Sequence, residues 1–380
     1  TDRIGFWLDQ KHPYITYAPE YIEVLWQIIA RIAKKKLLYQ DFKVVPYCPR
    51  CGTALSSHEV ALGYRTVTDN SVYIKFKLKP KQKIGNFVTD DNTYILSWTT
   101  TPWTLPGNVA LAVNKNIIYA VVRTLNVKKR ASGGSVEYEN LIIAEDIFNA
   151  LWGAEDSNPL KLAFDLVYAH AIREGEDVIK APEKLISIKG NFLASLKYDP
   201  LFKITKLQNN RSYKIYAANF VTAEEGTGVV HTAVMYGEDD FELGTKVGLP
   251  KFHTVNGEGN FIGDFGAALK GLSAKSPKSE IYILDYLQKK GLLFAVRPYE
   301  HEYPYCWRCG SALLYYAKTS WFIAMRKVRK QLEANNEKTN WIPSHIKHGR
   351  FGEWLKDVKD WAISRERYWG TPLPVWECKK

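Results

Sequence analysis

Residues 98 to 108 read Trp98-Thr-Thr-Thr-Pro-Trp-Thr-Leu-Pro-Gly-Asn108 and directly follow the apolar run Tyr94-Ile-Leu-Ser97. Pro102 and Pro106 fix φ and lack an N–H donor, so this stretch is neither a helix nor a central strand. We expect a strand that ends in a rigid loop lined with threonine hydroxyls. Such hydroxyls donate and accept hydrogen bonds without carrying charge, which suits a ligand with an ester or hydroxyl group. The alternative is that the threonines fill a strand and both tryptophans fill the core.

Two short cysteine motifs of one pattern, Pro-Tyr-Cys-x-Arg-Cys-Gly, lie far apart in the sequence. The first motif includes Tyr47-Cys48-Pro-Arg-Cys51-Gly52, and the second includes Tyr305-Cys306-Trp-Arg-Cys309-Gly310. We call each of these motifs a cysteine knuckle. A tight turn with glycine after the second cysteine directs both thiolates to one point, and two such turns make a closed tetrahedral site for structural zinc. The separation far exceeds that of an ordinary zinc ribbon, so we expect a domain inserted between the knuckles. A redox dithiol is the alternative for a single Cys-x-x-Cys motif.

Composition restricts the class of protein and of partner. The chain has 380 residues, 46% of them hydrophobic, which is enough for a sizeable core. A net charge of +12 favours a polyanionic partner such as nucleic acid, although many surface lysines only aid solubility. No apolar run approaches the ~18–20 residues of a membrane span, and no signal peptide is visible. Cysteine usage fits a reducing compartment, so we expect a cytoplasmic protein without a membrane partner.

Between the knuckles, short strands and turns alternate with few helices, which is typical of a compact, β-barrel-like domain. The sequence also predicts an exposed hairpin tip at Val127–Ser135. Helices are predicted where proline, acidic or serine caps and apolar spacing coincide. The expected helices begin at Ala18-Pro19-Glu20, span Glu145–Trp152, run from the Ser276 cap to Lys290, and span Trp321–Leu332.

A second stretch with chemical potential is Gly226-Thr-Gly-Val-Val-His231, which leads through Gly237 to Asp240 and Phe241. Gly226 and Gly228 allow a close backbone approach to a ligand. His231 ends a buried strand, where a histidine is usually a core residue. Asp239 or Asp240 could cap a helix that begins at Phe241, which is the usual role of an aspartate before a helix. A divalent metal held by His231 together with Glu238, Asp239 and Asp240 is the other interpretation.

With these motifs in hand, the chain resembles the isoleucyl-tRNA synthetase family, in particular its editing insertion (connective peptide 1) with the zinc neck. The motifs at Tyr47–Gly52, Trp98–Asn108, Gly226–Asp240, Tyr305–Gly310 and Asp360–Val375 match in order. Valyl and leucyl relatives carry Thr-Thr-Arg-Pro in the threonine motif. Here Pro102 directly follows Thr101, which favours the isoleucyl branch.

The resemblance implies a mixed α+β fold. A β-barrel-like editing domain would be inserted through a zinc-ribbon neck into helical, partly Rossmann-like flanks. It implies a helical catalytic-domain flank at 1–43, a neck at 44–62 and 299–316, an editing domain at 63–298, and a return to an incomplete class I catalytic domain at 317–380. It also implies four cysteine ligands for a structural Zn²⁺: Cys48, Cys51, Cys306 and Cys309.

The implied activity is that of an aminoacyl-tRNA deacylase, which hydrolyses misacylated valyl-tRNA(Ile). The partners would be the acceptor 3′ end of tRNA(Ile) and its valine ester, and we expect a monomer. Asp240 follows His231 at the spacing of the family's amine-binding aspartate, and His231 would line the side-chain pocket. Further implied contacts with the adenosine, the ester or the attacking water come from the loop: Trp98, Thr99, Thr100, Thr101, Trp103, Thr104 and Gly228.

Two departures from the family pattern qualify this interpretation. The His-x-Gly-His and Lys-Met-Ser-Lys-Ser motifs that bind ATP are absent from these 380 residues, so we do not expect this piece to activate isoleucine. Ala233-Val234-Met235 contains no proline where the family has a small-Pro pair. Two rival functions remain: a non-catalytic, zinc-stabilised tRNA-binding module, and a metal-dependent hydrolase at His231 and Asp240.

Overall fold

The computed structural model describes residues 2–125, 138–153, 161, 182–224, 226–263, 265, 268–364 and 370–376. The chain forms two compact units, one of Thr1–Lys43 with Lys318–Lys380 and one of Val44–Ala317. The expected hairpin tip at Val127–Ser135 and the fifth cysteine, Cys378, lie outside the described residues.

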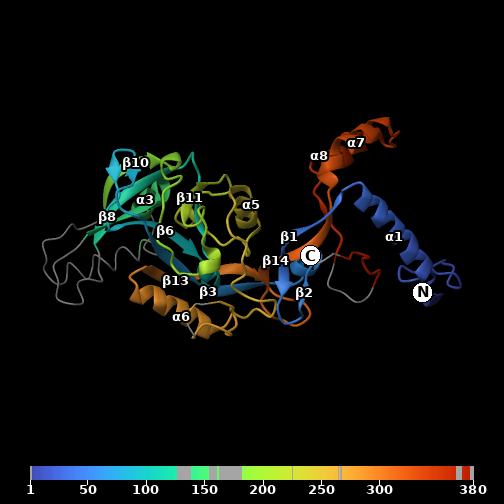
Figure 1. Ribbon diagram of the computed structural model, residues 1–380, viewed down its shortest axis with the longest axis horizontal. Helices are drawn as coiled ribbons and strands as arrows, with labels where there is room; N and C mark the ends of the chain where they lie inside the picture. Colours follow the sequence, from blue (N-terminus) through green and yellow to red (C-terminus); the bar gives the residue numbers. More distant parts are fainter. Residues whose placement is uncertain are drawn as a thin grey trace. The chain divides into compact units, whose positions relative to one another are not determined.

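Helices and strands are mixed along the whole described chain (Figure 1). The helices are η1 Asp2–Ile4, α1 Pro19–Lys34, α2 Ser57–Ala61, η2 Pro102–Gly107, α3 Glu145–Gly153, η4 Gly190–Phe192, η5 Thr205–Leu207, α5 Glu238–Val247, α6 Pro277–Lys289, α7 Met325–Lys338, η6 Ser344–Ile346 and α8 Arg350–Lys356. The strands are β1 Leu38–Cys48, β2 Thr53–Ala54, β3 Tyr64–Lys77, β4 Lys83–Ile84, β5 Phe87–Val88, β6 Thr93–Thr99, β7 Ala110–Val113, β8 Ile118–Leu125, β9 Tyr138–Ala144, β10 Glu183–Lys189, β11 Lys214–Ala217, β12 Val229–Thr232, β13 Leu293–Pro304, β14 Leu314–Ile323 and β15 Trp361–Ala362.

The larger unit is built on a six-stranded sheet of order β10-β8-β9-β6-β3-β13. Strands β3 and β13 form its longest ladder, antiparallel from Leu293 opposite Ile74 to Pro304 opposite Tyr64. Residues Ser71 to Phe76 of β3 are all buried, because this half of the strand is covered on both faces. In the strand order, β6, which leads into the threonine loop, lies inside the sheet between β3 and β9.

A smaller sheet, β11-β7-β12, brings the second chemical stretch to the same place. Strand β12 runs antiparallel to β7, with His231 opposite Leu111. It also contacts β6, and the Ser97 hydroxyl of β6 donates a hydrogen bond of 2.8 Å to the carbonyl of Val229. The two motifs singled out in the sequence, although more than a hundred residues apart, thus end on neighbouring strands.

A buried ion pair crosses the large sheet. Lys75 on β3 reaches Glu139 on β9 with Nζ–O distances of 2.6 and 2.8 Å, and both side chains are buried. The Lys75 ammonium also lies 5.0 Å from the ring centre of Tyr94 on the intervening strand β6. Burial raises the pKa of Glu139, and the adjacent lysine offsets only part of this rise. Each charge is compensated within the sheet, as buried ions require.

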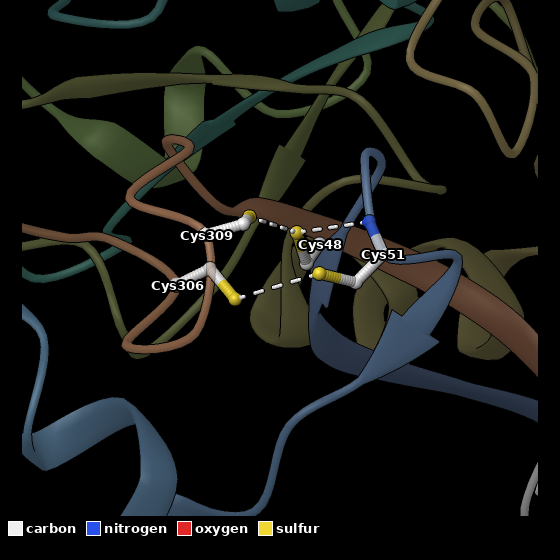
Figure 2. A group of neighbouring side chains, drawn as sticks. All are labelled: Cys48, Cys51, Cys306 and Cys309. Carbon is white, nitrogen blue, oxygen red and sulfur yellow. Dashed lines mark hydrogen bonds between the residues drawn. The ribbon is translucent and has the colours of Figure 1, made fainter.

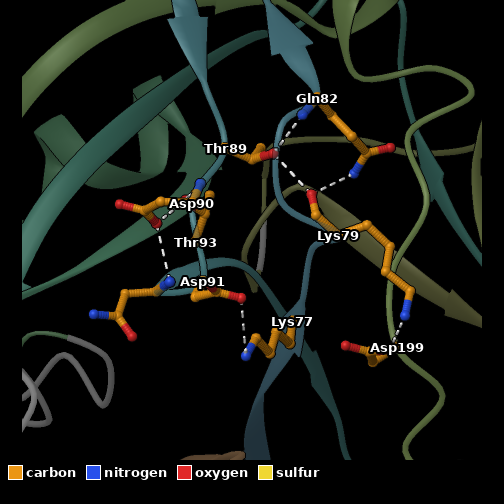
Figure 3. A network of polar contacts seen from close by, with 9 residues as sticks. Lys77, Lys79, Gln82, Thr89, Asp90, Asp91, Thr93 and Asp199 are labelled. Atoms are coloured by element: carbon orange, nitrogen blue, oxygen red, sulfur yellow. Dashed lines mark hydrogen bonds and ion pairs between the residues drawn. The ribbon is translucent and has the colours of Figure 1, made fainter.

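A polar network fixes the opposite end of β6 from the threonine loop (Figure 3). The Thr89 hydroxyl donates to the carbonyl of Lys79 at 2.7 Å and accepts the backbone N–H of Gln82 at 2.9 Å. At the start of β6, the Thr93 hydroxyl donates to Asp90 at 2.6 Å. These residues satisfy one another, so the network holds the turn around the short β4–β5 hairpin.

The expected mixed α+β class is confirmed. In the described residues every sheet is open, because in each sheet of three or more strands the first and last strands do not pair with each other. Closure into a barrel therefore stays a prediction, as does a partly Rossmann-like flank. None of the helices in the described parts combines the length and the apolar character needed to cross a lipid bilayer.

Three predicted helices are confirmed as α1, α3 and α6. In α6, Ser276 is the N-cap and accepts the backbone N–H of Lys278 at 3.2 Å. Two details were wrong. Trp321 to Ile323 belong to strand β14, because this aromatic and β-branched stretch pairs with β15, and helix α7 begins only at Met325. Helix α5 begins at Glu238 with Gly237 as its N-cap, so Asp239 and Asp240 lie within its first turn and do not cap it.

Candidate functional site

The threonine loop is held by its own hydroxyls. After β6, Pro102 starts the short helix η2, and Thr101 takes a non-helical conformation before it. The Thr99 hydroxyl accepts the backbone N–H of Thr101 at 3.0 Å and lies 3.1 Å from the Thr101 hydroxyl. One turn later, Thr104 donates its hydroxyl to the carbonyl of Thr101 at 2.8 Å. The loop is therefore preorganised, as the two prolines predicted.

His231 joins this network from β12. Its Nε2 lies 2.9 Å from the Thr104 hydroxyl oxygen. Because Thr104 already spends its single proton on the carbonyl of Thr101, it accepts from His231, which must carry its proton on Nε2. His231 Nδ1 is then a bare acceptor, and among the described residues it has no hydrogen-bond partner. Burial lowers the pKa of His231 to about 4, so the ring is neutral at pH 7.

Asp240 lies on the first turn of α5 and faces back toward the end of β12. Its Oδ2 accepts the backbone N–H of Ala233 at 3.1 Å, two residues beyond His231. Burial raises the pKa of Asp240 to about 7; the bond from Ala233 opposes this shift, and the nearby charge of Asp239 adds to it. A carboxyl group in this state gains most from a cation that arrives beside it, because the cation favours its charged form.

The two tryptophans of the loop contact different neighbours. Trp98 stacks on Tyr73 at 6.3 Å between ring centres and meets Tyr299 edge-on at 5.5 Å. Trp103 is buried and meets Tyr236 edge-on at 5.0 Å. Sequence reasoning missed Tyr236. Its hydroxyl accepts the backbone N–H groups of Thr254 and Val255, and only its position before Gly237 hinted at a role.

Both glycines before β12 need the left-handed conformation and a missing side chain. Gly226 has φ +73°, and a Cβ there would lie 1.6 Å from Nε1 of Trp98. Gly228 has φ +71°, and its Cβ would lie 2.5 Å from the Cβ of Ala144. The close approach predicted for these glycines is thus made to the protein's own side chains.

The structure brings most of the predicted residues together. Thr99, Thr101, Thr104 and His231 form one hydrogen-bonded network, and Asp240 is attached beside it through Ala233. Thr100 is partly exposed and takes no part in that network among the described residues. Trp98 lies on β6, Trp103 lies in η2, and Gly228 directly precedes β12.

The four knuckle cysteines converge as the paired motifs predicted. Figure 2 shows Cys48 and Cys51 approaching Cys306 and Cys309 from two separate segments. The sulfur atoms of Cys48 and Cys309 are 3.5 Å apart, those of Cys51 and Cys306 are 4.0 Å apart, and all four lie within 4.8 Å of one another. Sulfurs around a tetrahedral zinc ion are about 3.8 Å apart, given Zn–S bonds of about 2.3 Å. The set fits a closed metal site.

The two knuckles share one backbone geometry. Gly52 and Gly310 have φ +66° and +69°, and each donates its N–H to the carbonyl of the first cysteine, at 2.9 and 2.8 Å. Cys48 and Cys306 are buried with Leu55, Val60 and Leu313. Within the described residues, these cysteines are the one cluster of potential ligands close enough to hold a metal, and His231 with its acidic neighbours does not form another.

Comparison with known proteins decides the family. The model of the class I tRNA synthetases for I, L, M and V matches residues 1–380. The chain belongs to this family. Among relatives of this class I synthetase chain, isoleucine–tRNA ligase of Clostridium tetani is 41% identical over 100% of the chain and 32% of its own length. The enzymes of Clostridium acetobutylicum and Picrophilus torridus are 42% and 38% identical, with the same coverage. The chain thus spans about a third of these curated relatives.

Solved structures similar to this synthetase chain include two editing domains of cytosolic leucyl-tRNA synthetases. That of P. knowlesi is 14% identical, with 63% of this chain and 99% of that chain covered at a TM-score of 0.39. That of P. falciparum is 13% identical, with 47% and 66% covered at a TM-score of 0.28. The family assignment rests on the sequence matches alone.

Proposed function

We propose that this chain is the editing part of an isoleucine–tRNA ligase and hydrolyses valyl-tRNA(Ile). The observation that carries the proposal is the network of Thr99, Thr101, Thr104 and His231, with Asp240 held beside it. The match to isoleucine–tRNA ligases along the whole of this chain, which is about a third of their length, supports the choice of amino acid and of tRNA.

The need for such an activity follows from the substrate. Valine and isoleucine differ by one methylene, and a pocket distinguishes them by only about 1–3 kcal/mol, a limit for which the isoleucine enzymes are themselves the standard worked case. A second site that accepts only the smaller side chain and hydrolyses its ester removes the error. The acceptor 3′ end of tRNA(Ile) would then bind as partner, and a net charge of +12 favours that polyanion.

Each residue has a physical role in this proposal. Asp240, ionised by the approach of a cation, pairs with the α-ammonium of valine. The neutral ring of His231 lines the side-chain pocket and excludes the extra methyl group of isoleucine. Thr99, Thr100, Thr101 and Thr104 hold the terminal adenosine and the ester, while Trp98, Trp103 and Gly228 shape the pocket.

Catalysis in this site rests on positioning. The site offers no strong base among the described residues, since burial lowers the pKa of His231 to about 4 and its Nε2 proton is directed to Thr104. A water molecule held by hydroxyls and aimed at the ester carbonyl gains rate from its orientation.

The remaining parts have supporting roles. We infer a structural zinc held by Cys48, Cys51, Cys306 and Cys309, which closes the neck at 44–62 and 299–316 below an editing domain at 63–298. Residues 1–43 and 317–380 would belong to the catalytic domain. A monomer in the cytoplasm completes the proposal.

The deciding experiment is hydrolysis of valyl-tRNA(Ile) against isoleucyl-tRNA(Ile) by this chain, with Asp240→Ala alongside. Selective loss of the valyl ester, abolished by the substitution, is the expected result. Absence of hydrolysis together with salt-sensitive tRNA binding would instead support a non-catalytic, zinc-stabilised tRNA-binding module. Loss of hydrolysis on metal removal from a fully folded chain would support a metal-dependent hydrolase.

A further inference from the structure

Each cysteine knuckle carries a tyrosine immediately before its first cysteine. Tyr47 precedes Cys48, and Tyr305 precedes Cys306. Neither tyrosine is needed to ligate a metal. Both rings point into chains of aromatic contacts, and these chains end at the two tryptophans of the threonine loop.

The first aromatic chain follows alternate residues of β13. Successive ring centres are 5.5 Å apart from Trp98 to Tyr299, 5.7 Å from Tyr299 to His301, 5.9 Å from His301 to Tyr303, and 6.0 Å from Tyr303 to Tyr305. Because alternate residues of a strand share one face, all four β13 and knuckle rings lie in one row. The row joins the entrance of the threonine loop to the residue next to Cys306.

Several residues of this first row have further contacts that hold them in place. The Tyr303 hydroxyl donates to the carbonyl of Leu313 at 2.7 Å, and Leu313 packs against the cysteines. The Lys275 ammonium lies 3.9 Å from the ring centre of Tyr303, and Asp69 lies 3.2 Å from His301. At the end of the row, Tyr305 donates its N–H to the carbonyl of Gly63 at 2.8 Å.

The second aromatic chain uses different strands and reaches the other knuckle. Ring centres are 5.0 Å apart from Trp103 to Tyr236, 6.2 Å from Tyr236 to Tyr316, and 5.4 Å from Tyr316 to Tyr47. Val255 holds both central rings by its backbone. Its carbonyl accepts the Tyr316 hydroxyl at 3.1 Å, and its N–H donates to the Tyr236 hydroxyl at 2.8 Å. Both central rings are therefore also held in place.

We propose that these two rows couple the four-sulfur site to the threonine loop, one row for each knuckle and each tryptophan. Rings at these separations are in direct contact, and close-packed side chains with fixed partners transmit a displacement because they cannot compress. When the knuckles close on a metal, Tyr47 and Tyr305 are drawn with them, and Trp103 and Trp98 take their working positions. Tyr303 and Tyr316 are then positioning residues.

This inference rests on the proposed metal site and does not require that the loop hydrolyses an ester. A readout of the tryptophans themselves is therefore the appropriate test. The chain is labelled with ¹⁵N-tryptophan, and the indole N–H resonances of Trp98 and Trp103 are assigned from single Phe substitutions. Spectra of the metal-free and zinc-loaded chain are compared, with zinc content measured on each sample.

We expect both resonances to shift on zinc loading. Tyr303→Leu should abolish the shift of Trp98 and leave that of Trp103, whereas Tyr316→Leu should do the reverse. Tyr303→Phe and Tyr316→Phe keep the rings and should keep the shifts, which separates ring contact from the loss of a hydroxyl. Trp26 and Trp341, which belong to the other unit, serve as controls and should not move.

Three outcomes would overturn the inference. One is a chain that takes up zinc while Trp98 and Trp103 stay unmoved. Another is a pair of Leu variants that bind zinc and retain both shifts. The third is a uniform response of all tryptophans, Trp26 and Trp341 included. A chain that takes up no zinc would instead remove the proposed metal site, on which the coupling depends.

Discussion

His231 and Thr104 are hydrogen-bonded at 2.9 Å although 127 positions separate them in the sequence. The bond fixes the neutral histidine with its proton on Nε2, because Thr104 donates to Thr101. It also joins strand β12 to the loop after β6, so the two stretches that carry the proposed chemistry are held against each other by a buried hydrogen bond.

Thr104→Val should disturb both stability and selectivity. The substitution removes the acceptor of a buried N–H, which costs about 1–3 kcal/mol of unfolding free energy. It also removes the hydrogen bond that orients the His231 ring, so the ratio of the hydrolysis rates of the valyl and isoleucyl esters should become smaller. Urea unfolding and the two hydrolysis rates measure these effects. Thr100→Val is the matched control for stability, since Thr100 lies in the same loop outside the network; an equal loss of unfolding free energy there would contradict the assignment.

Asp240→Asn should lower kcat/KM for the valyl ester by about ten- to hundredfold, which corresponds to about 1.5–3 kcal/mol for a hydrogen bond between charged groups. The neighbouring Asp239→Asn lies on the same turn of α5 but is exposed, and it should have little effect. If both variants hydrolyse the ester as the unaltered chain does, Asp240 does not bind the ammonium.

Hydrolysis should have an acid limb that belongs to Asp240. Its pKa is raised to about 7, so kcat/KM should fall as the pH drops below about 7, after correction for spontaneous hydrolysis. The corresponding fall in kcat should occur at lower pH, because in the complex the bound ammonium favours the ionised carboxylate of Asp240. His231, with a pKa lowered to about 4, should add no limb near 6.5. A profile unchanged in Asp240→Asn would refute this origin.

Stability should carry the same signature with a defined sign. Between pH 3.8 and about 7 the folded chain holds a proton on Asp240 that the unfolded chain has lost, so this group lowers the unfolding free energy as pH rises. Asp240→Asn should remove that fall. His231 acts in the opposite direction between about pH 4 and 6.5, because there only the unfolded state is protonated. Urea midpoints across this range, compared with His231→Gln, separate the two groups.

Removing one knuckle cysteine should loosen the fold. Cys306→Ser should lose bound zinc and lower the midpoint of urea unfolding, because metal binding contributes to folding free energy. Cys378→Ser changes the fifth cysteine, and zinc content and midpoint should then match those of the unaltered chain. A loss of zinc in Cys378→Ser, or its retention in Cys306→Ser, would contradict the four-sulfur site.

Gly228→Ala should be far more costly than Gly248→Ala. Both glycines are left-handed, at φ +71° and +77°, so both substitutions incur about 1–2 kcal/mol of backbone strain. Only at Gly228 does the new methyl group meet another atom, the Cβ of Ala144 at 2.5 Å. The difference between the two unfolding free energies isolates that clash, and equal values would show that β9 moves aside freely.

The parts that could be predicted from the sequence are those with local causes. Paired Cys-x-x-Cys-Gly turns predicted the sulfur cluster because the turn itself aims the thiolates, and Ser276 with Pro277 predicted the start of α6. Prolines at 102 and 106 likewise predicted an ordered loop after β6.

Other features depend on partners distant in the sequence. Trp321 to Ile323 are compatible with a helix until β15 pairs with them. A helix cap was one interpretation of Asp240, yet its carboxylate accepts the backbone N–H of Ala233, a contact that no local pattern reveals. The contact of Trp103 with Tyr236 and the pairing of Lys75 with Glu139 likewise arise only once strands are assembled.

The Lys75–Glu139 pair has a consequence for how this sheet is assembled. It spans three strands, with β6 in the middle, and β6 carries Trp98 and Thr99 at its end. A slip of one residue between neighbours would turn a charged side chain to the wrong face and leave it buried without its counterion. The penalty falls on every misaligned arrangement and spares the correct one. The ion pair thus selects the alignment in which the threonines emerge beside His231, and it acts before any substrate is present.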